Sequence, residues 1–261
     1  MGADPVIEVE GLSASYNGDP VLRDVSFSVR RGEVLVILGG SGCGKSTLLR
    51  HVIGLRTPTS GRIRVLGLDP TSVSGRDRLY LLRRMGVMFQ GGALFGSMTL
   101  LDNVRLPLET FTPLPPEAVE LAAVMKLKLV GLEAFRDYMP GELSGGMRKR
   151  AAMARAIALD PSVLFLDEPS AGLDPVASAE LDQLVLRLAR SLDMTFVIVS
   201  HELASIFTVA DRVIMLDRAT RSIVAEGRPA ELRDRSDNPA VRAFFNRQPG
   251  RTDGEAGREH A

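Results

Sequence analysis

The sequence predicts an α/β fold built around a mainly parallel sheet, and two observations carry that prediction. Short, nearly uninterrupted apolar runs occur at 33–39, 162–167, 195–200 and 212–217, and such runs suit strands that are buried on both faces. Helical patterns at 176–192 and 202–210 separate the last three of these runs. Buried strands that alternate with helices are typical of a parallel sheet covered by helices.

The remaining elements follow in chain order. Residues 5–34 alternate apolar and polar side chains ("VIEVEGLSASY", "VLRDVSFSV"), which predicts half-buried antiparallel strands. A helix is expected over 45–55, and strand alternation returns at 61–69. From residue 90 to about 160 the pattern is mostly helical, interrupted by the proline-rich turn 112–118. Residues 248–261 are polar and glycine-rich, which predicts a disordered tail.

Composition excludes several classes of protein. The 261 residues are 45% hydrophobic, enough for a large core, and the 32 basic and 32 acidic residues give no net charge. Such a balance provides no global field for nucleic acid, so no nucleic-acid partner is expected. The single cysteine rules out an intramolecular disulfide or a zinc cluster. The N-terminus has no secretory signal and no stretch approaches a membrane helix, so we expect a soluble chain.

A phosphate-binding loop is the strongest local motif. "GGSGCGKST" fits the pattern G-x-x-x-x-G-K-[ST] after a predicted strand and before a predicted helix. We predict that the backbone amides enclose phosphate oxygens, that Lys45 reaches the β- and γ-phosphates, and that Ser46 binds Mg²⁺. A chance glycine-rich turn is the alternative, and we interpret Cys43 as a small tolerated side chain rather than a redox switch. The candidate binding residues are Gly39, Gly40, Ser41, Gly42, Cys43, Gly44, Lys45, Ser46 and Thr47.

Two further strands end in groups suited to hydrolysis. "VLFLDEP" ends in Asp167, a candidate Mg²⁺ ligand, and Glu168, a candidate general base. Either acid could instead cap a helix, but a position at the tip of a neighbouring strand beside the phosphate loop favours the catalytic role. "FVIVSHE" repeats this arrangement with His201, whose imidazole could contact the γ-phosphate rather than serve the structure alone.

"LSGGMRKR", 143–150, places a serine and two glycines before a helical pattern, which is how a second phosphate-binding helix start is built. We therefore predict that Ser144, Gly145 and Gly146 bind phosphate. For the cluster of Arg148, Lys149 and Arg150 we favour a solvated or dimer-facing surface over binding of lipid headgroups.

Together these motifs resemble the ATP-binding-cassette ATPases over residues 6 to about 230. The resemblance implies one cassette domain over 1–247, with an antiparallel β subdomain and a helical subdomain inserted at about 91–160. It also implies that Tyr16 stacks on adenine, that Gln90 senses Mg²⁺ and reports to the transport partner, that Asp174 ends the loop after the base, and that His201 is the switch histidine. ATP and Mg²⁺ are the implied cofactors.

In that family, the 143–150 motif binds the γ-phosphate held by a second copy of the chain, so the resemblance implies an ATP-sandwiched homodimer with two sites. Nucleotide then shifts the population between open and closed dimers. The segment 241–247, "VRAFFNR", either packs back on the body or reaches across to the neighbouring subunit, and the sequence leaves both readings open.

Finer features resemble the ATPases of the Mla/Mce-type lipid transporters. Met147 replaces the commoner glutamine, as it does in that subfamily, and "RLYLLRRMGVMFQGGALFGSMTLLDNVRLPL" follows their pattern, although Gly91 stands where serine is expected. The resemblance implies phospholipid transport and a peripheral location at the cytoplasmic face of the inner membrane. The implied partners are a polytopic permease docked near 90–108, an MCE-domain protein and a STAS-type regulatory subunit.

Three other functions compete with this one. A transporter ATPase for another substrate, such as an amino acid or a metal complex, would use the same cassette chemistry. A cassette ATPase of DNA repair or translation is disfavoured, because the chain has one cysteine, no heptad run and one cassette. A regulator that binds but does not hydrolyse nucleotide is disfavoured because Glu168 and His201 are both present.

Overall fold

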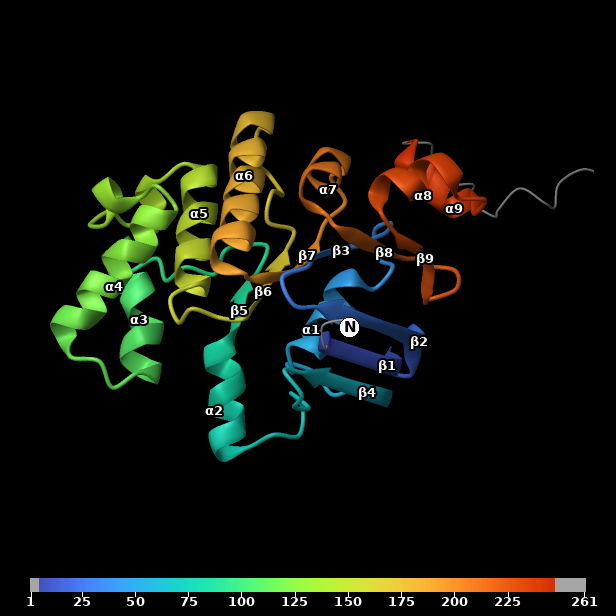
Figure 1. The fold of residues 1–261 in the computed structure, drawn as a ribbon, viewed down its shortest axis with the longest axis horizontal. Helices are drawn as coiled ribbons and strands as arrows, with labels where there is room; N and C mark the ends of the chain where they lie inside the picture. The colour runs from blue at the N-terminus through green and yellow to red at the C-terminus, as the bar shows by residue number, and fades with distance from the viewer. Residues whose placement is uncertain (1–4, 247–261) are drawn as a thin grey trace, which may run out of the picture.

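The computed structural model describes residues 5–246, which form two sheets and the helices that cover them (Figure 1). The predicted disordered tail, 248–261, lies outside the described residues. The fold has the predicted class: a mainly parallel core sheet, an antiparallel sheet and a group of helices at one end. Among the described residues, no helix combines the length and the apolar character needed to cross a membrane.

The smaller sheet is antiparallel, as the alternation at the N-terminus predicts. It contains β1 (Pro5–Tyr16), β2 (Asp19–Arg30) and β4 (Ser60–Val65) in the order β2-β1-β4. Its inward side chains share one core with α1 (Lys45–Val52) and with one face of the larger sheet. This packing holds α1, which follows the phosphate loop, between the two sheets.

The larger sheet has the order β5-β6-β7-β3-β8-β9. Its strands are β5 (Met85–Met88), β6 (Val163–Asp167), β7 (Thr195–Val199), β3 (Val34–Leu38), β8 (Arg212–Leu216) and β9 (Ile223–Gly227). The first five run parallel, and β9 pairs antiparallel with β8. Every residue of β3, β6 and β7 is buried, which agrees with their uninterrupted apolar sequences.

One predicted pair of neighbouring strands is wrong. β6, which ends in Asp167, does not lie beside β3, because β7 pairs with both strands and separates them. The connection α6 (Pro175–Leu192) carries the chain from β6 to β7, and α7 (Leu203–Val209) carries it from β7 to β8 on the far side of β3. Parallel strands still end at one edge of the sheet, so the tips of β3, β6 and β7 remain close together.

The helical region comprises α3 (Leu100–Phe111), α4 (Pro116–Leu129) and α5 (Gly145–Ala156), with short 3₁₀ turns at Glu133–Phe135 and Pro140–Glu142. Thr99 and Asp102 form a reciprocal capping box at the start of α3. Buried residues of all three helices share one core cluster with β3 and β6. The helical region is therefore anchored to the sheet through α5, which lies beside α6 in Figure 1.

Three helices carry little signal in the sequence. α2 (Gly75–Arg84) buries only Leu81, and α8 (Pro229–Arg235) buries only Pro229. α9 (Pro239–Phe245) packs back on the body: Val241 and Phe245 are buried, and the ring centroids of Phe207 and Phe245 lie 5.7 Å apart. The described part of 241–247 therefore adopts the first of its two predicted positions within the single chain.

Candidate active site

The phosphate loop lies between β3 and α1, with a backbone that only glycine adopts easily. Gly39 has φ +145°, and a Cβ there would lie 2.3 Å from the carbonyl oxygen of Leu216. The Nζ of Lys45 donates to the carbonyls of Gly39 at 2.8 Å and Gly40 at 3.0 Å. The ammonium is thus folded back over the loop, where it can meet an anion held by the backbone amides. This geometry does not fit the alternative of a chance glycine-rich turn.

A cleft of about 660 Å³ opens above this loop and collects most of the predicted residues. Its walls include side chains from both sheets and from three strand tips. The lining residues are Val21, Gly39, Gly40, Ser41, Gly42, Gly44, Lys45, Ser46, Thr47, Gln90, Glu168, His201 and Phe244. Val21 and Phe244 carried no signal in the sequence, because an apolar side chain near a nucleotide site looks like any other core residue.

Ser46 and Asp167 meet although they are 121 positions apart. The Oγ of Ser46 donates to Oδ1 of Asp167 at 3.0 Å, and Asp167 is 6% exposed. A hydroxyl and one carboxylate beside a phosphate site are oxygen ligands of the kind that suits Mg²⁺, which keeps waters and phosphate oxygens as its other ligands. The residues present therefore fit the predicted metal.

Glu168 and His201 form a pair at the tips of β6 and β7. The Nδ1 of His201 lies 2.8 Å from the carboxylate of Glu168. Glu168 is 9% exposed and has φ +49°, while its amide donates to the carbonyl of Val199 at 2.9 Å. The left-handed backbone turns this carboxylate toward the cleft, where it can accept a proton from water.

Neither acid at the end of β6 caps a helix. The N-cap of α6 is Asp174, whose Oδ1 accepts from the amides of Val176 and Ala177, both at 3.0 Å. The hydrogen bond from the Ala177 amide contributes most to lowering the pKa of Asp174. The helix-cap alternative for Asp167 and Glu168 is therefore wrong.

Four of the predicted binding residues lie away from the lining of this cleft. The Oγ of Ser144 accepts from the amide of Met147 at 3.2 Å and caps α5, and Gly145 and Gly146 form its first turn. Gly146 packs on α6, where an added Cβ would lie 3.2 Å from that of Ala177. Asp174 is exposed at the start of α6.

Two other predicted residues point elsewhere in this structure. The ring of Tyr16 lies under the guanidinium of Arg56, whose carbon is 5.2 Å from the ring centroid. Cys43 is 2% exposed, and burial raises the pKa of its thiol, which supports its interpretation as a small tolerated side chain. Neither residue lines the cleft.

Lys149 corrects the expectation for the basic cluster at 148–150. Arg148 is exposed as predicted, but Lys149 is only 9% exposed. Its Nζ donates to the carbonyl of Gln90 at 2.5 Å and to that of Glu168 at 3.4 Å. Helical spacing was the signal that could have found it, because Ala152 and Met153, three and four residues later, are both buried.

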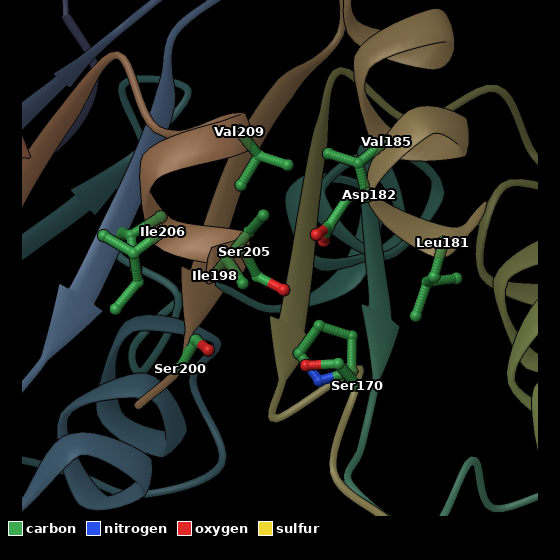
Figure 2. A pocket seen from close by; sticks show the side chains of 11 residues that line it. Ser170, Leu181, Asp182, Val185, Ile198, Ser200, Ser205, Ile206 and Val209 are labelled. Carbon is green, nitrogen blue, oxygen red and sulfur yellow. The ribbon is translucent and has the colours of Figure 1, made fainter. Parts of the chain in front are cut away.

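A second, much smaller cavity lies below the strand tips, between α6, α7 and β7 (Figure 2). Its volume of about 10 Å³ is close to that of a single water site. Asp182, Ser170, Ser200 and Ser205 line it together with apolar side chains. Burial raises the pKa of Asp182, although a hydrogen bond from Ser205 opposes the shift. This cavity is too small for a nucleotide and stands apart from the phosphate loop.

The fold and the cleft define a phosphate-loop domain of the nucleotide-hydrolysing type. The family model described as ABC transporter matches residues 22–171, so the chain belongs to the ABC transporter family. Within that family it is an ATP-binding subunit that hydrolyses ATP. The chain is 40% identical over 242 residues to the intermembrane phospholipid transport system ATP-binding protein MlaF of Escherichia coli (strain K12), covering 92% of this chain and 88% of MlaF.

It is also 44% identical over 241 residues to the probable ribonucleotide transport ATP-binding protein mkl of Mycobacterium leprae, covering 92% of this chain and 68% of that protein. Among solved structures, cbiO1 from Clostridium perfringens, part of the ABC transporter complex cbiONQ, aligns with a TM-score of 0.79 at 31% identity over 88% of this chain and 90% of that chain. A dimeric ATP-binding cassette bound to ADP and Pi aligns with a TM-score of 0.77 at 28% identity, over 85% and 98%.

Proposed function

We propose that this protein powers a phospholipid transporter by ATP-driven dimerisation. The observation that carries the proposal is the 40% identity to MlaF over 88% of that protein, and it is supported by one cleft that brings together Lys45, Ser46, Gln90, Glu168 and His201. The name of the mycobacterial relative favours a second candidate, a transporter for another substrate. The amino acids and metal complexes expected from the sequence belong to that second class.

The predicted site residues have proposed roles in ATP hydrolysis. Backbone amides of 39–47 and the ammonium of Lys45 bind the β- and γ-phosphates. Glu168 accepts the proton of the attacking water, and His201 holds that carboxylate on one side and contacts the γ-phosphate on the other. We assign Tyr16 to the adenine, which requires its ring to exchange the Arg56 guanidinium for the base.

Mg²⁺ belongs to the proposed site. Ser46, Asp167 and the side chain of Gln90 would hold it, and when bound it supplies positive charge that neutralises the phosphates during transfer. Support comes from the contact between Ser46 and Asp167 and from Gln90 in the lining of the same cleft.

The segment starting at Ser144 serves a second copy of the chain in this proposal. Ser144 is exposed at the start of α5 and lies outside the lining of its own cleft. A hydroxyl, the amides of Gly145 and Gly146 and a positive helix end are suited to bind the γ-phosphate of the opposite protomer. Asp174, exposed near that surface, completes the proposed interface. A solved relative that is dimeric and holds ADP and Pi is consistent with such an arrangement.

We further propose that the chain is peripheral at the cytoplasmic face of the inner membrane and docks on a polytopic permease near 90–108. Within that segment, Phe95 is 48% exposed, and a docked partner would bury this large apolar side chain. On the preceding helix α2, Tyr80 and Leu82 are also exposed, at 46% and 40%. An MCE-domain protein and a STAS-type subunit are the other proposed partners, and no nucleic acid is expected.

A pull-down tests the transported class directly. Tagged Glu168→Gln chain is incubated with ATP and native membranes, and the captured proteins and lipids are identified by mass spectrometry. A polytopic permease together with an MCE-domain protein supports phospholipid transport. A permease with a solute-binding protein transfers the function to the second candidate and leaves the catalytic roles unchanged.

A further inference from the structure

Helix α5 holds the Gln90 loop through two cations, the buried Lys149 and the half-buried Arg155. Lys149 donates to the carbonyl of Gln90, and Arg155 donates to the carbonyls of Gly92 at 3.1 Å and Ala93 at 2.7 Å. The backbone of this loop lies close against α5, since a Cβ on Gly92 would be 3.3 Å from that of Ala152. Movement of α5 is therefore transmitted to the loop by direct contact.

Lys149 differs from Arg155 because it also contacts the other side of the site. Its ammonium lies 3.4 Å from the carbonyl of Glu168, the residue whose side chain meets His201. β5 and β6 are paired neighbours, so the Gln90 and Glu168 segments leave the sheet side by side. One buried ammonium thus joins three segments: α5, the Gln90 loop and the end of β6.

Burial makes this arrangement specific. A lysine that is 9% exposed is costly to bury unless its ammonium is hydrogen-bonded and near negative charge. Desolvation lowers the pKa of Lys149, and the nearby carboxylates of Glu168 and Asp167 oppose the shift. The group is therefore held by the charges and carbonyls of the catalytic segment, and not merely by packing.

We propose that Lys149 is a positioning residue for ATP hydrolysis, which ties α5 to the main chain of Gln90 and Glu168. The inference rests on the proposed function, in which Glu168 is the general base and the start of α5 meets the partner's nucleotide. Lys149 lies five residues after Ser144, so the helix that contacts one nucleotide also sets the backbone of the base at the other. Lys149 thus links the helix that meets the partner's nucleotide to the general base of its own site.

The test compares three variants of the full chain. Lys149→Met keeps an unbranched side chain, one atom shorter, and removes the charge and donors, whereas Lys149→Gln keeps a donor. Lys126→Met is the matched control, because Lys126 is also buried, at 8% exposed, but pairs with Asp160 away from the cleft. Steady-state phosphate release gives kcat and KM for ATP, and thermal unfolding gives the stability of each variant.

We expect kcat of Lys149→Met to fall by about 10- to 100-fold, since small misplacement of a reacting group has effects of that size. KM for ATP should stay within about twofold, because Lys149 does not line the cleft. Lys149→Gln should retain more activity than Lys149→Met. Lys126→Met should be destabilised but keep kcat within about twofold of the wild type.

A further measurement separates positioning from nucleotide binding. In the Glu168→Gln background, Lys149→Met should still form the ATP-bound dimer, because the phosphate-binding atoms are intact. Wild-type kcat in Lys149→Met, an equal loss of kcat in Lys126→Met, or loss of the ATP-bound dimer would each overturn the inference. Normal turnover in Glu168→Gln alone would instead overturn the proposed function, so the two failures are distinguishable.

Discussion

Arg212 holds together the part of the molecule that carries the phosphate loop. Its Nε donates to Oε1 of Glu33 at 2.6 Å, and its Nη2 donates to Oε2 of Glu33 at 2.9 Å and to the carbonyl of Ser28 at 2.6 Å. A further ion pair joins it to Glu226. These contacts connect β2, the start of β3, β8 and β9, and β3 leads directly into the phosphate loop. Arg212→Met should therefore destabilise the whole nucleotide site.

The magnitude follows from burial. The side chains of Arg212 and Glu33 are 17% and 9% exposed, and removing one partner of a buried pair costs about 3–5 kcal/mol. For a chain of this size each kcal/mol lowers Tm by about 2–4 °C, so even the lower figure predicts a loss of about 6–12 °C. Arg105→Met is the control, because Arg105 and Glu109 form an exposed i,i+4 pair worth about 0.3–0.5 kcal/mol.

The pKa of Glu33 determines how the stability that this ion pair contributes depends on pH. Burial acts to raise the pKa of Glu33, but the hydrogen bonds from Arg212 and from the Arg30 amide outweigh it and lower the pKa below 4.5. The stabilisation from Glu33 is therefore present above pH 4.5 and is lost as pH falls through the lower folded value. The difference in Tm between wild type and Arg212→Met should have its full size at pH 7 and should become smaller below pH 4.5.

Thermal unfolding followed by circular dichroism at pH 7 and pH 4 is the assay. The double variant Glu33→Gln/Arg212→Met should be more stable at pH 7 than Arg212→Met, because no unpaired carboxylate remains buried. A Tm for Arg212→Met within about 2 °C of the wild type at pH 7 would show that this ion pair does not stabilise the fold.

Three further predictions concern the site and its surroundings. Gly39→Ala should abolish binding of a fluorescent ATP analogue, since its Cβ would lie 2.3 Å from the Leu216 carbonyl oxygen. Gly40→Ala should bind the analogue normally, because no atom of residues 5–246 lies within 4 Å of the added Cβ. Arg155→Met should increase hydrogen exchange of the backbone amides in the loop 90–93 without weakening binding of that analogue. Unchanged exchange would contradict the role of Arg155 in holding this loop on α5. Asp182→Asn should stabilise the protein at pH 7 more than at pH 3, as measured by urea denaturation. The pKa of Asp182 is raised in the folded protein, so the ionisable carboxyl destabilises the fold at pH values above the pKa of the unfolded chain. An equal effect at both pH values would exclude this contribution of Asp182.

The parts of the fold that could be predicted are those with local causes. The apolar strands β3, β6, β7 and β8 and the phosphate loop were recognisable because burial on both faces and a tight glycine-rich turn each demand particular residue types. The order of the strands was not, since it depends on where connections cross the sheet. β7 therefore separates β3 from β6, contrary to the sequence-based expectation.

In the candidate site, too, the residues with local sequence signals could be predicted and those that depend on distant contacts could not. Lys45, Ser46, Glu168 and His201 stand at strand ends or helix starts, and parallel topology gathers such positions at one edge. Lys149 differs from its predicted solvated position, because its place on the buried face of α5 outweighs its charge. The sequence contains no record of the carbonyls of Gln90 and Glu168 that compensate its burial.

Sedimentation velocity of Glu168→Gln with and without ATP measures ATP-driven dimerisation itself. We expect a monomer without nucleotide and a dimer with ATP, because the isosteric amide keeps phosphate binding but cannot accept the proton from water. Adding Ser144→Arg should prevent the dimer while each monomer still binds nucleotide. A Glu168→Gln/Ser144→Arg chain that still dimerises with ATP would contradict the assignment of Ser144 to the partner's phosphate.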